Sequence, residues 1–188
     1  MDLAGAYRAC ARVAKREARN FYYAFLSLPI RQRRGVYALY TFCREADDVA
    51  DGAPSMGAPS ASENIFDVLR SDVIPESTGS IDSRREQVAR MRERLAKAAA
   101  GDPEGGRDLA LADAIATFGV DPNDLADVLT GMEMDLTLRR IDTFEDLRTY
   151  CYHAASAVGL ATLPILNDGV PPTDAMRDAA VELGLGMQ

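Results

Sequence analysis

The sequence predicts an all-α fold. Apolar residues recur at helical spacing along nearly the whole chain, and no segment shows the alternation typical of a half-buried strand. No Asn-Gly or Asp-Gly pair joins two alternating segments, so the pattern does not indicate a β-hairpin. A chain of 188 residues is long enough for one domain with a substantial core. We therefore expect residues 1–188 to form a single helical domain.

Breaks rich in Gly, Pro, Ser and Asp divide the chain into its expected helices. A short aromatic stretch at 21–25 connects the first two helices, and loops are expected at 52–64 and 75–82. The Asp121-Pro122 pair is a typical helix start, because proline suits the first turn. The expected helices cover residues 3–19, 30–51, 65–71, 83–100, 107–118, 121–139, 142–164 and 171–188.

Composition excludes several classes of function. The net charge of −8 makes general nucleic-acid binding a poor interpretation. Cys10, Cys43 and Cys151 lie far apart without metal-ligand or redox spacing, so we expect reduced core thiols in a cytoplasmic protein.

The N-terminus lacks the apolar region of a signal peptide. The uncharged stretch at 149–167 is interpreted as a core helix rather than a membrane span, and peripheral membrane contact is left open.

The helix expected at 30–51 places charged side chains on its apolar face. On a wheel of about 100° per residue, Arg44, Asp47 and Asp51 fall within roughly 60° of one another and of Tyr40. The same stripe carries residues that the helix would bury (Val36 and Cys43). Burying such charges costs several kcal/mol each unless they are paired or bind ions.

The two carboxylates suit a hard cation. Asp47 and Asp51 are one turn apart, and Mg²⁺ bound through one or two carboxylates commonly takes further ligands from substrate phosphates. Arg44 and Tyr40 would then contact phosphate oxygens or shape the pocket. Arg44 can also pair with Asp47 at i,i+3 or with neighbours of Glu45. The alternative is a solvated helix end, although negative charge is unfavourable at a helix C-terminus.

Several segments together resemble the squalene/phytoene synthase family. The first group is FYYAF at 21–25, LP at 28–29, RR at 33–34, YALY at 37–40 and CREADDVAD at 43–51. The second group is GMEMDL at 131–136, TFEDL at 143–147, YCY at 150–152 and ASAVGL at 155–160. The closing LGLGMQ at 183–188 is similar to the start of the family's second aspartate-rich helix.

The resemblance implies an isoprenoid synthase (terpenoid synthase-like) helical bundle, incomplete in this chain. It implies a prenyltransferase that condenses two farnesyl or geranylgeranyl diphosphates head to head, through a cyclopropyl intermediate, to presqualene/squalene- or phytoene-type products. NADPH would be used only if the product is squalene. The resemblance also implies roles for individual residues. Asp47 and Asp51 would be Mg²⁺ ligands, and Tyr40 and Arg44 would belong to the diphosphate site. Arg19, Asn20 and Phe21 would contact the substrate, and Gln188 would begin the second motif.

The chain departs from the family pattern in three places. Glu17, Arg19 and Asn20 lie where members often carry a His-Ser-Lys-Ser-like stretch, and Ser156 replaces a common glycine. The second aspartate-rich segment after Gln188 is absent, so we expect that this chain cannot complete the metal site alone. The alternative function is a non-catalytic helical module that binds a prenyl diphosphate or a partner helix. The oligomeric state is left open.

Other residues receive narrower interpretations. His153 is expected to serve packing, and Asp135 faces either the pocket or the surface. The Arg-rich run at 84–94 alternates with acids and is expected to form a solvated face. A carbocation needs a dry apolar wall, for which the candidates are Phe21, Phe25, Tyr40, Met132, Val158 and Leu160.

Overall fold

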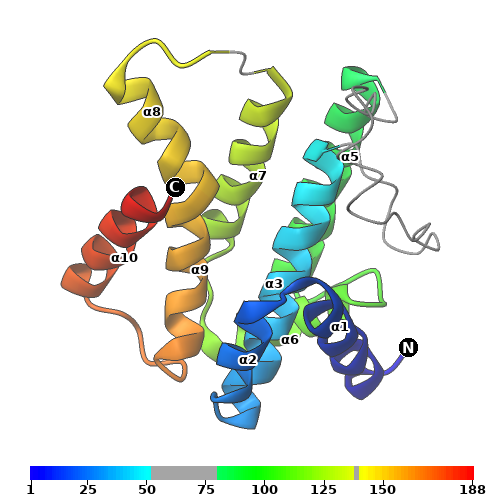
Figure 1. Cartoon of the computed structure of the whole chain (residues 1–188). Helices are drawn as coiled ribbons and strands as arrows, with labels where there is room; N and C mark the ends of the chain where they lie inside the picture. The colour runs from blue at the N-terminus through cyan, green and yellow to red at the C-terminus, as the bar shows by residue number, and fades with distance from the viewer. Residues whose placement is uncertain (52–79, 138–139) are drawn as a thin grey trace, which may run out of the picture.

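A computed structural model describes residues 1–51, 80–137 and 140–188, and all regular structure in these ranges is helical (Figure 1). The predicted all-α class is therefore confirmed. The loop predicted at 52–64, the helix at 65–71 and most of the loop at 75–82 lie outside the described residues. The helices are α1 (Leu3–Glu17), α2 (Asn20–Leu26), α3 (Ile30–Asp51), α5 (Ile81–Ala99), α6 (Asp108–Phe118), α7 (Pro122–Thr137), α8 (Phe144–Cys151), α9 (Ala157–Leu166) and α10 (Asp174–Met187), with a π-helix at Tyr152–Ser156 between α8 and α9.

Polar side chains begin several of these helices. Asp2 accepts a hydrogen bond from the Gly5 N–H at 2.8 Å, which caps α1. Thr143 accepts a hydrogen bond from the backbone N–H of Asp146 at 3.1 Å and caps α8. These oxygens satisfy backbone donors that the first turn of a helix leaves without intrahelical partners.

Two segments differ from the prediction. The aromatic stretch at 21–25 is part of helix α2, where Tyr22 and Phe25 pack on Tyr37 at ring-centroid distances of 6.2 and 6.1 Å. The helix predicted at 142–164 is interrupted by the π-helix and continues to Leu166. Both departures arise from tertiary packing, which outweighs the weak local preference of short segments.

Helix α3 is the central element of the described structure (Figure 1). It packs against α1, α5, α6, α7 and α9, while α10 lies against α8, the π-helix and α9. Leu125, Leu129, Leu160 and Ile165 are fully buried, and each such side chain stabilises the fold by about 1.5–3 kcal/mol. None of the described helices combines the length and apolar character needed to cross a lipid bilayer.

Arginines of α5 tie three helices together. Arg94 Nη2 lies 2.9 Å from Glu45 Oε2 of α3 and 2.6 Å from Asp108 Oδ1 of α6. Arg92 pairs with Glu133 of α7 at 2.9 Å. The prediction that the run at 84–94 forms only a solvated face is therefore wrong for these two arginines, because acids on neighbouring helices lie within reach of their long side chains.

Replacing Arg94 with methionine tests this tie. Methionine keeps the apolar stem but leaves the carboxylates of Glu45 and Asp108, which are 11% and 10% exposed, with one cation fewer. We expect the free energy of unfolding to fall by about 2 kcal/mol, measured by urea denaturation. The matched control is Arg90→Met, since Arg90 pairs with Glu86 in solvent and should contribute less than about 0.5 kcal/mol. Equal effects of the two variants would contradict the prediction.

Candidate active site

The inward face of α3 lines a cavity of about 400 Å³. Tyr40, Arg44 and Asp47 contribute to its wall together with Val36 and Cys43, as the wheel predicted. Helix α2 supplies Phe21 and Phe25, α7 supplies Val128 and Met132, and the π-helix and α9 supply Ala154, Val158 and Thr162. The charged groups therefore line a chamber whose wall is otherwise mostly apolar.

Arg44 provides the cationic group of this chamber. Its Nη2 lies 2.6 Å from Asp48 Oδ1, an i,i+4 pair within α3. Asp48 is only 8% exposed, so this pair holds the guanidinium in place. Arg44 Nε is buried and donates to no acceptor among the described residues. That N–H is a donor that an anionic ligand in the cavity can satisfy.

Tyr40 provides a second donor. Burial raises its pKa, and Glu17 and Asp47 raise it further, against the lowering effect of Arg44. The phenol therefore remains protonated at neutral pH. Its ring contacts Phe25 edge-on, at a centroid distance of 5.9 Å, which fixes the direction of the hydroxyl.

Cys43 lines the same cavity without offering reactive sulfur. Burial raises the pKa of its thiol to about 12, and Asp47 contributes to the shift. A thiol is nucleophilic and binds metals only as the thiolate. Cys43 therefore acts as a neutral wall residue, in agreement with the predicted core role of the cysteines, all three of which are free.

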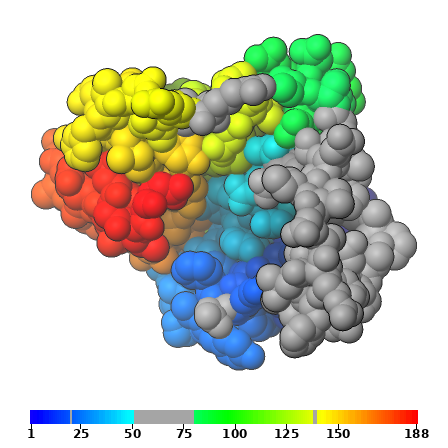
Figure 2. Space-filling view, turned by 45° about the horizontal axis from the view of Figure 1, so that its top comes forward, coloured from blue at the N-terminus to red at the C-terminus, as the bar shows by residue number. Residues whose placement is uncertain are grey.

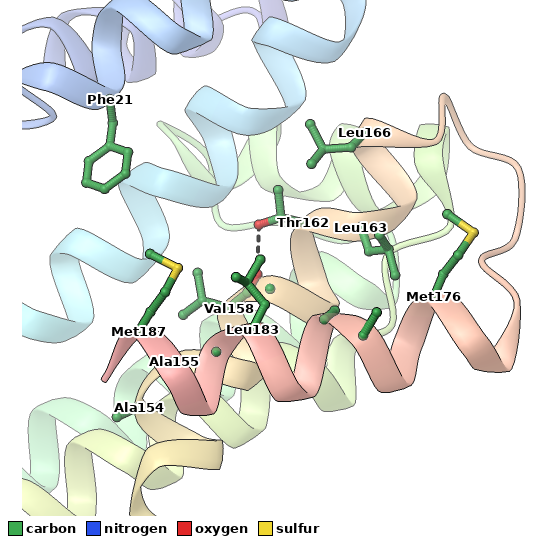
Figure 3. A pocket seen from close by; sticks show the side chains of 14 residues that line it. Phe21, Ala154, Ala155, Val158, Thr162, Leu163, Leu166, Met176, Leu183 and Met187 are labelled. Carbon is green, nitrogen blue, oxygen red and sulfur yellow. Dashed lines mark hydrogen bonds between the residues drawn. The ribbon is translucent and has the colours of Figure 1, made fainter.

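An apolar groove continues from this cavity between α2, α9 and α10 (Figure 2). Its volume is about 640 Å³, and it shares Phe21, Ala154, Val158 and Thr162 with the cavity on α3. Figure 3 shows Phe21 on one side of the groove and Met187 on the other. The remaining wall consists of small and aliphatic residues of α9 and α10 (Gly159, Leu163, Leu166, Met176, Ala179, Ala180, Leu183 and Gly184, with Ala155 of the π-helix).

Among the described residues that line the groove, only Thr162 carries a hydroxyl, and this hydroxyl bonds within its own helix. Its Oγ1 donates to the Val158 carbonyl at 2.7 Å, as drawn in Figure 3. The groove wall therefore presents aliphatic and phenyl groups, together with the thioethers of Met176 and Met187, to whatever enters. A surface of this kind binds hydrocarbon.

The π-helix at Tyr152–Ser156 shapes one side of the groove. Its extra residue per turn places Ala154 and Ala155 toward the groove, while Tyr152 donates to Asp127 of α7 at 3.2 Å. Ser156 is fully buried and donates to the Val181 carbonyl of α10 at 2.8 Å. π-helical turns are frequent at functional sites because they re-aim neighbouring side chains.

Some predicted residues are not part of the cavity. Arg19 is exposed, has a φ of 43° between α1 and α2, and lines neither the cavity nor the groove. Gln188 is also exposed, although Met187 beside it lines the groove. Asn20 begins α2 and Asp51 ends α3, but the side chains of both lie outside the described residues. Their predicted roles remain predictions.

Two further expectations are decided by burial. Leu160 is 2% exposed and packs in the core, so its predicted place in the cavity wall was wrong. The other five residues predicted for that wall do line the cavity. Asp135 is exposed on α7. Burial together with a hydrogen bond to Asp135 raises the pKa of Tyr150 to about 12.

His153 contacts α7 and lines neither hollow. Its Nδ1 is 3.6 Å from Asp127 Oδ1, and its ring meets Tyr152 edge-on at 5.1 Å. This placement agrees with the predicted packing role. Among the described residues, no group of three or more His, Cys, Asp or Glu side chains is arranged to hold a metal ion.

Sequence reasoning missed two parts of the site. Asp48 was not singled out, although its i,i+4 spacing from Arg44 is a signal for pairing. The apolar face of α10, including Leu183 and Met187, was interpreted as the start of the second aspartate-rich helix and was not assigned to a groove. Its exposure of 64% and 69% at these two residues marks a surface that lines a groove.

Comparison with known proteins identifies the family. The model of the squalene/phytoene synthase family matches residues 14–188, and the chain belongs to this family. It is 31% identical over 197 residues to 15-cis-phytoene synthase of Synechococcus elongatus, covering all of this chain and 56% of that protein. It is 32% identical over 188 residues to the chloroplastic phytoene synthase of Daucus carota, covering 97% of this chain and 40% of that protein.

Solved structures agree on the fold. A dehydrosqualene synthase crystallised with a ligand matches with a TM-score of 0.73 and 27% identity, over 99% of this chain and 55% of that one. The squalene synthase HpnC from Alicyclobacillus acidocaldarius matches with a TM-score of 0.78 and 25% identity, over 99% of this chain and 59% of that one. The chain thus spans about half the length of the relatives it matches.

Proposed function

We propose that this chain forms the diphosphate- and prenyl-binding wall of a Mg²⁺-dependent enzyme that condenses two prenyl diphosphates head to head. The observation that carries the proposal is the continuity of the two hollows. Tyr40, Arg44 and Asp47 lie at one end, and an apolar groove begins at residues that both hollows share. A ligand that fits this arrangement has an anionic head and a long hydrocarbon tail.

The head of the ligand would be held by donors and cations of α3. Arg44 Nε has no acceptor among the described residues, and the neutral Tyr40 hydroxyl is a further donor. Both are suited to the oxygens of a diphosphate. Asp48, which pairs with Arg44, keeps the guanidinium oriented before the ligand arrives.

The carboxylates of α3 fit Mg²⁺. Asp47 lines the cavity beside Arg44, and Asp51 follows one helical turn later. Carboxylate oxygens are hard ligands, and two of them leave room for water and diphosphate oxygens in an octahedral shell. A bound Mg²⁺ would supply Lewis-acid stabilisation of the diphosphate leaving group. The role of Asp51 rests on its sequence position.

The groove would protect the hydrocarbon part during the reaction. Its wall carries no free hydroxyl, since Thr162 bonds to Val158, and Cys43 stays a neutral thiol. Such a wall binds the hydrocarbon chain and keeps hydroxyl and thiolate groups away from an allylic cation. The curated relatives named as phytoene synthases support a geranylgeranyl substrate and a phytoene-type product, a reaction without NADPH.

The proposed activity is tested by product analysis. The protein, with any sequence that follows Gln188 in its gene, is incubated with Mg²⁺ and either geranylgeranyl or farnesyl diphosphate. The expected result is diphosphate release and a hydrocarbon with twice the chain length of the substrate. Mg²⁺-dependent binding without turnover would instead support the non-catalytic module.

A bulky residue at Val158 tests the tail-binding role of the groove. Val158 lines both hollows, so a phenyl ring there should block the path between them. We expect Val158→Phe to weaken binding of a non-hydrolysable prenyl diphosphate analogue about tenfold and to leave inorganic diphosphate binding unchanged, measured by calorimetry. Val170→Phe, at an exposed position outside both hollows, is the control. An equal loss of affinity for the prenyl analogue and for inorganic diphosphate would show that Val158 does not act specifically on the hydrocarbon tail.

A further inference from the structure

The apolar groove follows one face of helix α10. Its lining residues on this helix recur at helical spacing, at positions 176, 179, 180, 183, 184 and 187. Met176 and Met187 lie at the two ends of this row (Figure 3). They are about 16 Å apart along the helix axis, since each residue of a helix rises 1.5 Å. The groove is therefore long enough to hold an extended hydrocarbon chain lengthwise.

The floor of the groove is closed by direct contact between α9 and α10. A Cβ added at Gly159 would lie 3.5 Å from the Ala180 carbonyl oxygen and 3.9 Å from the Ala180 Cβ. Gly184, one turn further along α10, approaches Ser156 in the same way. The two helices therefore run antiparallel with small residues at their contact. A chain in the groove lies along this contact and does not pass between the helices.

The connection between α9 and α10, residues 167–173, is held in place at both of its ends. Gln32 Nε2 of α3 donates to the Leu166 carbonyl at 3.0 Å. The side chain of Thr173 accepts from the backbone N–H of Met176 at 3.3 Å and caps α10. These contacts fix the end of the groove at which Leu166 and Met176 lie, so a chain that follows the two helices meets their connection there.

The charged head site lies toward the opposite end of this path. Gln32, which contacts Leu166, precedes Arg44 on the same helix by about 18 Å along the axis. Leu166 and Met176 line the groove but not the cavity that contains Arg44. A ligand whose head is held by Arg44 therefore directs the end of its tail toward Met176.

We propose that Met176 is the stop that sets the longest prenyl tail the groove accepts. A methionine side chain is long and adaptable, so it fills the end of an apolar channel without adding a polar group. Its position in the first turn of α10 is fixed by the Thr173 cap. The inference rests on the proposed function, and it names the residue that selects among prenyl diphosphates by length.

The spacing of the row on α10 matches the length of a prenyl chain. One turn of a helix rises about 5.4 Å, which is close to the extended length of one five-carbon prenyl unit. The path from Met187 to Met176 therefore holds about three units, and the unit that bears the diphosphate lies in the cavity beside Arg44. Four units make up a geranylgeranyl chain, so a longer tail should meet Met176.

Binding of analogues of graded length tests the stop. The protein, with any sequence that follows Gln188 in its gene, is titrated in Mg²⁺ with farnesyl, geranylgeranyl and geranylfarnesyl thiolodiphosphate by calorimetry. The unmodified protein should bind the geranylgeranyl analogue most tightly and the geranylfarnesyl analogue about tenfold more weakly. Met176→Ala should bring these two affinities to within about twofold of each other, because the shorter side chain leaves space for one more unit.

A bulky residue one turn nearer the head should move the stop in the other direction. Ala179 is exposed and lines the groove, so a phenyl ring there takes up groove space without displacing the core. Ala179→Phe should weaken binding of the geranylgeranyl analogue about tenfold and leave binding of the farnesyl analogue unchanged. Ala175→Phe, at an exposed position of α10 outside both hollows, is the matched control and should change neither affinity.

Met187→Ala is the matched control for Met176→Ala, because it truncates the same side chain at the other end of the groove. It should weaken binding of all three analogues by a similar factor and keep their order. Thermal unfolding of each variant verifies folding.

Two results would overturn the proposal. The first is the same order of affinities in Met176→Ala as in Met187→Ala, and the second is equal affinity of the unmodified protein for the geranylgeranyl and geranylfarnesyl analogues. Both results leave the proposed function untouched, since prenyl diphosphates still bind. The proposed function would fail, and the stop with it, if none of the three analogues bound in the presence of Mg²⁺.

Discussion

Replacing Asp47 with alanine should reduce Mg²⁺-dependent binding of a prenyl diphosphate analogue by at least about 100-fold. Asp47 lines the cavity on the same helix face as Tyr40 and Arg44, and its carboxylate is the Mg²⁺ ligand that we propose there. Without it, the cation would retain one fewer protein ligand and the diphosphate would lose its bridge to α3. Calorimetry with a thiolodiphosphate analogue, with and without Mg²⁺, measures the effect.

A binding measurement without Mg²⁺ shows whether the loss of affinity in the Asp47 variant depends on the metal. If Asp47 acts through Mg²⁺, the variant and the unmodified protein should bind the analogue equally weakly in the presence of a chelator. Asp178→Ala on α10 removes the same charge from an exposed position and should leave Mg²⁺-dependent binding unchanged. An Asp47→Ala protein that keeps its Mg²⁺-dependent affinity would refute the assignment of this carboxylate as a metal ligand.

Replacing Gly184 with alanine should lower the free energy of unfolding by about 3 kcal/mol. A Cβ at this position would lie 2.5 Å from Ser156 Cα and 2.6 Å from Ser156 N, so backbone rather than a flexible side chain must move. Gly184 is where α10 crosses the π-helix, and Ser156 bonds there to the Val181 carbonyl. The melting temperature should therefore fall by roughly 6–12 °C, measured by differential scanning calorimetry.

Gly186 is the matched control on the same helix. A Cβ there meets nothing within 4 Å, so Gly186→Ala should be neutral or slightly stabilising, because alanine favours a helix over glycine. The Gly184→Ala variant should also bind the prenyl analogue more weakly, since Gly184 lines the groove that α10 closes. Similar melting temperatures for the two variants would show that the close approach at Ser156 is not required for stability.

Local patterns were sufficient for most helices. Helix α3 has the predicted bounds, Ile30–Asp51, and α10 begins at Asp174, three residues after the predicted start at 171. An amphipathic period and a polar cap depend on neighbours within one or two turns, so they can be recognised without knowledge of the rest of the chain. For the same reason, the wheel placed Tyr40, Arg44 and Asp47 on one face before their partners were known.

Contacts between distant segments could not be obtained in this way. The pairing of Arg94 with Glu45 and Asp108 joins residues 49 and 14 positions apart, and no period in the sequence encodes it. Helix α2 is short, and its aromatic residues take helical geometry where they pack on Tyr37 and Tyr40. Leu160 and Val158 are both apolar, but Leu160 is buried in the core whereas Val158 lines the cavity. The difference arises because burial of a side chain depends on which other helices pack against it.

The sequence by itself determined the all-α class, the site-bearing helix and the chemical character of its charged face, because these depend on helical periodicity and residue type. Only the tertiary structure decided that Arg94 pairs with Glu45 and Asp108, that a π-helix adjoins the site, and that α10 closes a groove reaching the charged end. Those features arise where separate helices meet, and the packing of Gly184 against Ser156 sets how closely they can approach. A charged head site and a hydrocarbon groove become one binding surface only when α2, α3, α9 and α10 are brought together.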